Sequence, residues 1–248
     1  MRRFFVKSIE QNKQKVSLSG SEAKHIKNVL RLKPGDMVRL FDGSGCEYDA
    51  VIKHLSTAKT ELVMARKLAA ATTESSIQLM VAQGFLRQKK MDTLVRQLSE
   101  LGMTRWIPFF SERSVPRPDK KRLAARLQRW QKIVQESFKQ CGRSILPEIL
   151  PPASFEEVLA LGQACMLKYI FWENESQVLP QKSDIRLPKP GYRIIIVLGP
   201  EGGFTPQEIE KAKDCGFEVA GLGPRILRAE TATLAACTLM QYLYGDLG

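Results

Sequence analysis

The residues best suited to chemistry lie in the stretch LGPEGGFTPQEIEKA, residues 198–212, whose pattern predicts a strand end, a glycine-rich turn and a helix start. Such a turn often holds a phosphate, because free backbone amides and the helix dipole favour an anion there. Here no Lys-Ser or Lys-Thr pair follows the glycines, and Glu201 adds a carboxylate that would repel a phosphate. Thr205, Pro206 and Glu208 predict a capped helix whose amides are already partly satisfied. The turn therefore predicts close backbone approach to a ligand that is not mainly a phosphate.

A second turn repeats the tripeptide Leu-Gly-Pro in LGPRILRAETA, residues 222–232. Proline fixes φ and offers no donor, so the two turns would present carbonyls, a few amides and a rigid outline. This arrangement suits an adenine and a ribose better than a triphosphate. The alternative is that both turns are ordinary connections that end at a proline.

Other catalytic arrangements find little support in the sequence. His25 and His54 are the only histidines and lie far from the glycine-rich turn, which argues against a serine-histidine triad or a histidine metal site. The five cysteines are odd in number and never form Cys-x-x-Cys, so neither a disulfide framework nor a zinc knuckle is indicated. We predict no metal.

An alternation of strand-like and helical patterns begins at Ile77 and indicates an α/β fold with a mostly parallel sheet. Ligands of such sheets gather beyond the carboxyl ends of the strands. The segment 174–192 is polar and proline-rich and is predicted as a loop. The predicted strands are 77–85, 105–110, 165–172, 193–199 and 217–223, and the predicted helices are 89–101, 119–140, 205–214 and 229–244. The last helix is rich in small residues and would pack on a partner subunit or on the sheet.

The first 67 residues combine short alternating runs with the turn signals KPGD and DGSG, which is typical of a small β-rich module. Within it, 21–32 is predicted as a short helix. The small, polar segment 69–76 is interpreted as a linker. We therefore expect two domains, 1–70 and 71–248.

The net charge of +12 is unevenly distributed. Lys and Arg outnumber Asp and Glu by 14 to 7 in residues 1–70 and by 15 to 5 in 87–143, whereas 144–248 has 9 against 13. Nucleic acid is therefore the expected partner of the first two regions. The longest apolar runs are too short to span a membrane, and the first residues turn polar too early for a signal peptide, so we expect a cytoplasmic protein with no membrane partner.

Several motifs together resemble the bacterial 16S ribosomal RNA (uracil N3) methyltransferases, the RsmE family of the SPOUT class. The most specific pair is LGPEGGFTPQEI with LGPRILRAETA, and the ending YGDLG, FSERSV, RWQKIVQES, QCGR, PEI, VLRLKPGD and LFDGSG extend the resemblance over nearly the whole chain. The chain departs from many relatives at RQKKMD and at residues 96–97, where basic groups are kept but moved.

The resemblance implies a PUA-like β-barrel that helps to hold RNA in 1–70. It implies a SPOUT methyltransferase domain in 71–248, with a deep trefoil knot whose loops bind S-adenosylmethionine. It further implies a homodimer and transfer of a methyl group to N3 of the uridine at position 1498 of 16S rRNA, in the usual numbering, on free RNA or on the 30S subunit.

The site residues implied by the resemblance fall into three groups. Arg228 would stabilise negative charge on the uracil, and Glu230 or Glu201 would accept the proton or orient the ligand. The alternative for the arginine is a structural salt bridge. The alternative for the two glutamates is that their carboxylates only cap a helix or shape a turn. Cofactor contacts, mostly through the backbone, are expected from Trp172, Leu198, Gly199, Gly203, Leu222, Gly223, Ile226 and Leu227. RNA contacts are expected from Arg2, Arg3, Arg31, Arg87, Lys90, Arg113 and Arg143.

Two other functions stay open on the sequence. One is a SPOUT enzyme that methylates a ribose 2′-hydroxyl of another RNA, although the third motif of those enzymes usually carries Ser-Leu-Asn. The other is a non-catalytic RNA-binding protein that keeps the scaffold, which the intact glycine-rich turn disfavours.

Overall fold

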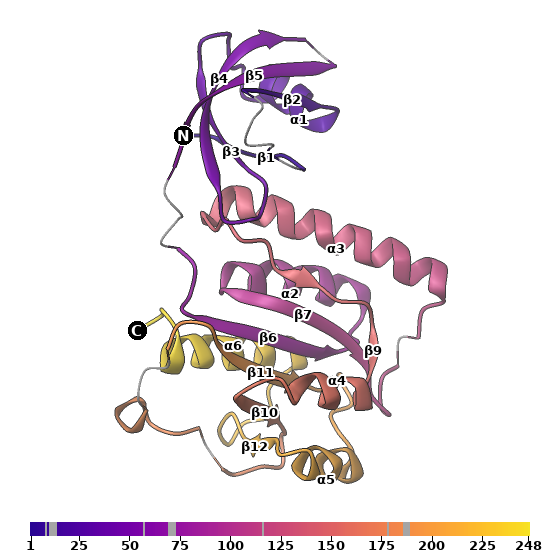
Figure 1. Cartoon of the computed structure of the whole chain (residues 1–248). Coiled ribbons are helices and arrows are strands. Elements are labelled where there is room, and N and C mark those ends of the chain that lie inside the picture. Colours follow the sequence, from indigo (N-terminus) through magenta and orange to yellow (C-terminus); the bar gives the residue numbers. More distant parts are fainter. Residues whose placement is uncertain are drawn as a thin grey trace. The chain divides into compact units, whose positions relative to one another are not determined.

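The computed structural model describes residues 1–7, 9, 14–56, 58–68, 73–115, 117–177, 179–185 and 189–248. The chain forms two compact units (Figure 1). The first consists of Met1–Glu74 and Gln135–Leu146, and the second of Ser75–Val134 and Pro147–Gly248. Residues 69–72 of the predicted linker lie outside the described residues, so the boundary between 70 and 71 stays a prediction.

The first unit is built on a five-stranded sheet in the order β1-β3-β4-β5-β2. All its neighbouring strands pair antiparallel except β1 and β3, which run parallel. Side chains alternate in burial along β3, so Val38 and Leu40 face a core that also contains Ile52 and Leu62. The strands are β1 (Arg3–Phe5), β2 (Lys15–Ser19), β3 (Met37–Phe41), β4 (Glu47–Leu55) and β5 (Lys59–Lys67).

The helix predicted at 21–32 is present but shorter. It comprises α1 (Ser21–Lys24) and a π-helical turn, η1 (His25–Val29). Arg31 has a φ of 52°, in the left-handed region that a helix cannot continue through. The conformation of this residue therefore explains the early end.

The segment Gln135–Leu146 joins the first unit although the sequence pattern placed it in the second domain. Ser44 and Ile145 form a β-bridge, and the amide of Leu146 donates to the carbonyl of Gly43 over 3.0 Å. Contacts of this kind join residues about a hundred positions apart, and local periodicity carries no information about them.

The second unit contains a seven-stranded sheet in the order β12-β10-β11-β6-β7-β8, with β9 also paired to β7, and every pairing is parallel. This confirms the predicted α/β class. The strands are β6 (Ile77–Gly84), β7 (Met103–Phe110), β8 (Glu148–Ile149), β9 (Ala153–Ser154), β10 (Leu167–Phe171), β11 (Tyr192–Leu198) and β12 (Glu218–Ala220). The helices are α2 (Gln88–Glu100), α3 (Lys120–Cys141), α4 (Phe155–Gly162), η2 (Lys182–Asp184), α5 (Pro206–Asp214) and α6 (Ala229–Tyr244). The end of α3, from Gln135, belongs to the first unit.

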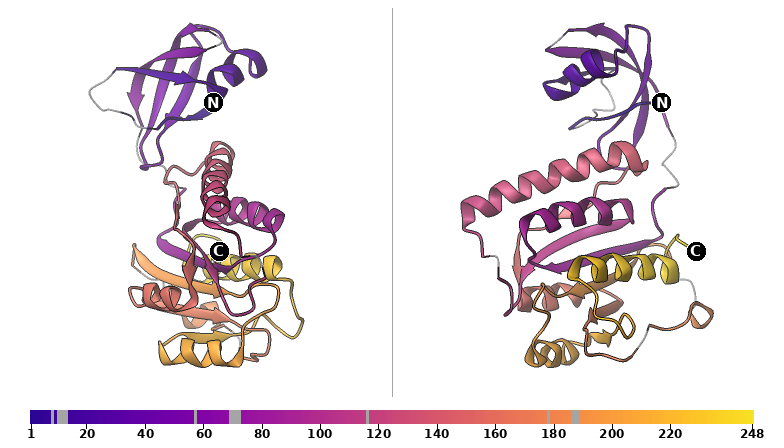
Figure 2. Two further views of the ribbon diagram at one scale, coloured as in Figure 1. Left: turned by 90° about the vertical axis from the view of Figure 1, so that its right-hand side faces the viewer. Right: turned by 180° about the vertical axis from the view of Figure 1, so that it is seen from behind.

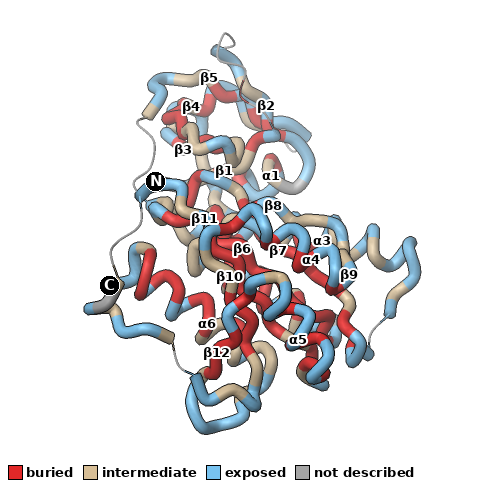
Figure 3. Tube along the Cα trace, turned by 60° about the horizontal axis from the view of Figure 1, so that its bottom comes forward, coloured by how far each residue is buried: buried red, intermediate tan, exposed pale blue. Residues whose placement is uncertain are grey.

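Helices cover both faces of this sheet (Figures 1 and 2). Met80, Ala82 and Val197 belong to a core cluster with Phe155 of α4 and Ile209 of α5. The intervening residues of β6 are also buried and face the side of α2 and α6, which contact each other. The central strands are thus buried on both faces (Figure 3), which explains why they read as continuous apolar runs.

The short elements β8, β9 and α4 were missed by the sequence patterns, although α4 carries a clear start signal. Ser154 accepts a hydrogen bond from the amide of Glu157, whose carboxylate in turn accepts from the amide of Ser154. This capping box could have been recognised in the sequence.

Because all strands of the sheet run parallel, the loops after β6, β10, β11 and β12 meet at one edge. Strand order alone does not establish the trefoil knot, which stays a prediction.

No helix among the described residues combines the length and apolarity that crossing a bilayer requires.

Candidate functional site

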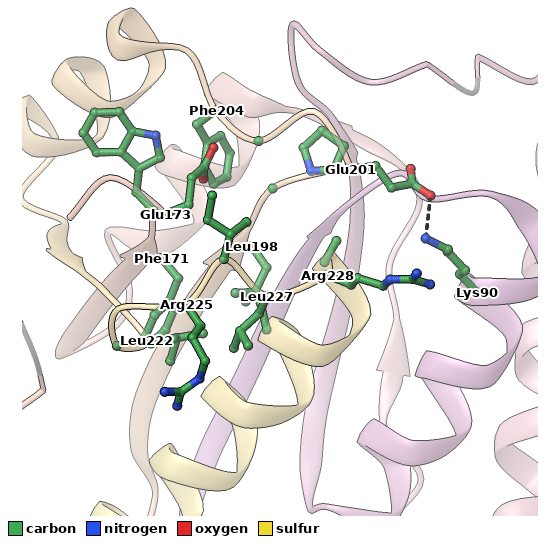
Figure 4. Close-up of a pocket in the computed structure, with 18 residues that line it drawn as sticks. Lys90, Phe171, Glu173, Leu198, Glu201, Phe204, Leu222, Arg225, Leu227 and Arg228 are labelled. Carbon is green, nitrogen blue, oxygen red and sulfur yellow. Dashed lines mark ion pairs between the residues drawn. The ribbon is translucent and has the colours of Figure 1, made fainter. Parts of the chain in front are cut away.

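A pocket of about 390 Å³ lies at the edge where the carboxyl ends of β10 and β11 meet the loop after β12 and the start of α6 (Figure 4). Its volume falls in the range of small-molecule sites. It is lined by Lys90, Phe171, Trp172, Glu173, Leu198, Gly199, Pro200, Glu201, Gly203, Phe204, Leu222, Gly223, Arg225, Ile226, Leu227, Arg228, Ala229 and Ala232. Both Gly-Pro turns singled out in the sequence therefore line a single pocket.

The first turn is held by its own sequence and by its neighbours. Thr205 caps α5 by accepting from the amide of Glu208, and Pro206 is the first helical residue, as predicted. Gly203 has a φ of 66°, which favours glycine, and a side chain there would collide with the carboxylate of Glu173. The turn keeps its shape because glycine occupies this position.

The second turn leads into α6 at Arg228. Arg228 is the N-cap residue, with φ −63° and ψ 148°, and its side chain makes no capping hydrogen bond. Figure 4 shows its guanidinium on the same side of the pocket as Glu201 and Lys90, whereas that of Arg225 points away from them. The two arginines of this turn thus have different surroundings.

Lys90 of α2 bridges the two turns. Its Nζ lies 3.1 Å from a carboxylate oxygen of Glu201 (Figure 4) and 3.1 Å from a carboxylate oxygen of Glu230. The side chains of Lys90, Glu201 and Glu230 are 31%, 33% and 28% exposed. The hydrogen bond to Glu201 and the weaker influence of the hydrogen bond to Glu230 raise the pKa of Lys90. Lys90 is therefore protonated at neutral pH. The ammonium group places a fixed positive charge at the pocket.

Glu230 experiences opposing influences. Burial raises the pKa of its carboxyl, but the hydrogen bond from its own backbone amide and the charges of Lys90 and Arg228 together bring the pKa below the ordinary value of 4.5. Glu230 is therefore ionised at neutral pH and is a weak base. This favours an orienting role over a proton-accepting role for Glu230.

Substituting Lys90 with methionine should give a pH-dependent loss of stability. A lowered carboxyl pKa contributes stability that is full above the unfolded-state pKa and is lost as pH falls through the folded-state value. The difference in melting temperature between wild type and Lys90→Met should therefore persist from pH 8 to pH 5 and shrink as the pH falls below 4.5. Lys90→Arg, which keeps the charge, is the control. A difference that stays constant down to pH 3 would rule out this role for the ion pair.

The residues predicted to contact the cofactor and those predicted to take part in the reaction lie close together in the structure. All eight residues predicted to contact a cofactor line the pocket, as do Arg228 and Glu201, and Glu230 joins them through Lys90. Lys90, predicted as an RNA contact, also lines the pocket. The individual roles of these residues stay predictions.

The remaining RNA-contact residues divide into exposed and internal ones. Arg2, Arg31 and Arg87 are exposed. Arg113 is also exposed, but its guanidinium donates to the carbonyls of Gly202 (3.1 Å) and Phe204 (3.3 Å), so it supports the glycine-rich turn.

Arg3 and Arg143 differ from the prediction, because both are internal to the first unit. Arg3 donates to the carbonyls of Phe138 and Arg143, each over 2.7 Å, and pairs with Glu47. Arg143 is 4% exposed and pairs with Glu74 over 2.8 Å. A buried guanidinium must be paired, and these pairs satisfy both side chains within the protein. These internal pairs favour a structural role for the two arginines over the predicted RNA contact.

Several pocket residues were not predicted from the sequence. Phe171 and Glu173 flank the predicted Trp172 at the end of β10, so the rule that ligands lie at strand ends could have found them. The indole Nε1 of Trp172 is buried and has no hydrogen-bond partner among the described residues. A buried donor without a partner is a natural contact for a bound polar group.

Two family models match the chain. A model described as an RNA methyltransferase domain matches residues 73–241, and a model described as an RNA methyltransferase PUA domain matches residues 18–62. The first match alone covers more than half of the chain.

Three similar proteins extend over nearly the whole length. The ribosomal RNA small subunit methyltransferase E of Buchnera aphidicola (subspecies Schizaphis graminum) is 32% identical over 255 residues and covers 99% of this chain and 97% of its own. That of Bacillus subtilis is 29% identical over 248 residues, with coverage of 98% and 96%. The crystal structure of the enzyme of the same name from Neisseria gonorrhoeae, bound to S-adenosylmethionine, is 35% identical, has a TM-score of 0.87 and covers 100% of both chains.

Proposed function

Because the chain belongs to the RNA methyltransferase family that includes the ribosomal RNA small subunit methyltransferase E proteins, we propose that it methylates N3 of a uridine in 16S rRNA, position 1498 in the usual numbering. The methyl donor is S-adenosylmethionine, as in the related crystal structure. The observation that carries the proposal is the single pocket formed by both Gly-Pro turns, with Arg228 beside it.

The residues of the pocket fit this donor. Leu198, Leu222 and Leu227 offer apolar surface to an adenosine, and the unpartnered Nε1 of Trp172 offers a buried donor. Glu173 supplies a carboxylate for an ammonium group. When bound, the donor supplies a methyl group on a sulfonium, which is already activated, so no metal is required for the transfer.

The chain's own residues have two tasks in this reaction. The first is to hold the uracil so that N3 faces the methyl group, since alignment dominates a transfer of this kind. The second is to favour loss of the N3 proton as the new N–C bond forms and the C–S bond breaks. Arg228, and the protonated Lys90 near it, stabilise the negative charge that develops on the uracil oxygens. Glu230 and Glu201 both orient Lys90 through ion pairs, and Glu201 is the candidate for proton acceptor because the pKa of Glu230 is lowered.

The experiment that tests this function uses labelled S-adenosylmethionine and 30S subunits from a strain that lacks the modification. After digestion of the RNA, we expect the label in 3-methyluridine. Label in 2′-O-methylated nucleotides would instead indicate the ribose methyltransferase, and the absence of label in RNA would indicate a non-catalytic protein.

The RNA partner is supported by the net charge of +12 and by the exposed Arg2, Arg31 and Arg87. Binding to a 16S rRNA fragment should weaken steeply with salt, because counterions are released from the phosphates. Arg31→Gln should weaken binding for all sequences alike and reduce the salt slope by about 1. Lys213→Gln, on α5 in the acidic part of the chain, should leave the slope unchanged. A salt-independent affinity of the wild-type protein would contradict the proposed interaction.

A homodimer in the cytoplasm, where ribosomes are assembled, completes the proposal. Its support in the structure is the set of apolar side chains exposed at the C-terminal end: Leu239 (36%), Tyr242 (44%) and Leu247 (48%). Light scattering should give twice the chain mass of 28.0 kDa, and Leu239→Glu should lower it toward one chain. Leu161→Glu, at a similarly exposed leucine of α4 (39%), is the matched control. A wild-type mass of one chain would disprove the dimer.

A further inference from the structure

A buried amide connects the first turn of the pocket with helix α6, which follows the second turn. Gln83 lies near the end of β6 and is fully buried. Its Nε2 donates to the carbonyls of Gly84 and Gly199, each over 3.0 Å. Its Oε1 accepts from the hydroxyl of Thr233 on α6, which is also fully buried. Both amide protons and the amide oxygen of Gln83 are thus engaged.

The chemistry of these groups permits one arrangement of this network. The hydroxyl of Thr233 has a single proton and a second acceptor within reach, the carbonyl of Ala229 at 2.8 Å. Donation to Ala229 would leave Oε1 of Gln83 buried without a donor, which is costly. A flipped amide would turn Oε1 toward the two carbonyls. The hydrogen bond between Thr233 and Gln83 is therefore needed to satisfy the network.

The network joins the segments that must be aligned for methyl transfer. The Gly199 carbonyl belongs to the first turn, and a Cβ on Gly84 would lie only 2.6 Å from the nitrogen of Pro200, so this turn rests directly on the end of β6. Thr233 lies one helical turn after Ala229, and its anchoring fixes the start of α6 that carries Arg228. Gln83 therefore sets the separation between the first turn and the arginine.

We propose that Gln83 and Thr233 are positioning residues for the methyl transfer. They hold the first turn, against which the donor lies, at a fixed distance from the helix start that bears Arg228 and Glu230. Neither side chain lines the pocket, so each acts through the elements that it connects. This inference rests on the proposed function.

The test compares Thr233→Val, which keeps the shape but removes the hydroxyl, with Thr233→Ser, which retains it. With the 30S substrate, Thr233→Val should lower kcat by roughly tenfold or more, since small misalignments are costly in such transfers. Its dissociation constant for S-adenosylmethionine, measured by calorimetry, should stay within about threefold of wild type, because the donor's backbone contacts remain. Thr233→Ser should retain most of the turnover.

Two further variants separate positioning from general loss of stability. Ser99→Ala removes another buried helical hydroxyl, which donates to the carbonyl of Val95 over 2.7 Å, and it lies outside the pocket. It should lower the melting temperature without lowering kcat. Gln83→Met breaks the network on the side of β6 and also frees the Gly199 carbonyl, so it should weaken donor binding somewhat but lower kcat by a clearly larger factor.

The inference is overturned if the folded Thr233→Val and Gln83→Met variants keep kcat within about twofold of wild type, or if they lose turnover only in proportion to donor affinity. Failure of the variants to fold at the assay temperature, while Ser99→Ala folds, would also overturn it, because the network would then serve stability. If the wild-type protein methylates no RNA, the proposed function itself fails, which is a different result.

Discussion

Replacing Arg228 with alanine should reduce kcat by about 10²- to 10³-fold, the usual cost of removing one preorganised group that stabilises transition-state charge. The side chain lines the pocket, makes no capping hydrogen bond and lies on the side of Lys90 and Glu201. Its charge is thus available to a uracil that is losing its N3 proton. Donor affinity should change little, and calorimetry with S-adenosylmethionine together with single-turnover kinetics measures both quantities.

Arg225 provides a control for this prediction. It comes from the same turn and lines the same pocket, but its guanidinium points away from Lys90 and Glu201 (Figure 4). Arg225→Ala should therefore affect kcat much less than Arg228→Ala. Equal losses from the two variants would mean that Arg228 contributes only general positive charge, and unchanged turnover of Arg228→Ala would remove its role altogether.

Replacing Gly84 with alanine should weaken binding of S-adenosylmethionine. The added Cβ would lie 2.6 Å from the nitrogen and 2.7 Å from the Cδ of Pro200, and a contact with main-chain atoms cannot be relieved by rotating a side chain. The first turn must move, and overpacking of this kind costs about 1–3 kcal/mol. Because the donor lies against this turn, restoring the turn to its observed position on binding would cost up to the same amount, an affinity loss of up to about 150-fold, which calorimetry measures directly.

Gly202 in the same turn offers a matched substitution. A Cβ there would lie 3.1 Å from the Cβ of Arg113, a contact that a shift of a few tenths of an ångström relieves, whereas the contacts at Gly84 are much closer. Gly202→Ala should therefore retain donor affinity close to that of wild type. Equal binding by Gly84→Ala and wild type would show that the first turn does not need its observed position to hold the donor.

The pocket could be predicted from the sequence because its walls are local motifs. The two Leu-Gly-Pro turns follow buried strands, and parallel strands bring their carboxyl ends to one edge, so Gly199 and Gly223 were expected to meet. Gln83 could not be found in this way. Its partners Gly199 and Thr233 lie 116 and 150 residues further along the chain, and no local pattern marks a buried amide that joins them.

The basic surface was the least predictable part of the molecule. A count of charges identifies the basic regions but does not distinguish the exposed Arg31 from Arg143, whose guanidinium forms an ion pair with Glu74 within the first unit. The same holds for the segment 135–146, which packs with residues far from it in sequence. In each case tertiary pairing, which periodicity does not encode, decides the outcome.

We propose that this pocket directs a methyl group to N3 of one uridine. Methylation at N3 blocks Watson–Crick pairing, so primer extension on 16S rRNA should stop beside the modified base. On RNA from 30S subunits treated with the protein and S-adenosylmethionine, we predict one new stop, at the nucleotide on the 3′ side of position 1498, that is lost with Arg228→Ala. Methyl incorporation without a stop, or a stop beside another base, would rule out N3 of this uridine as the methylated atom.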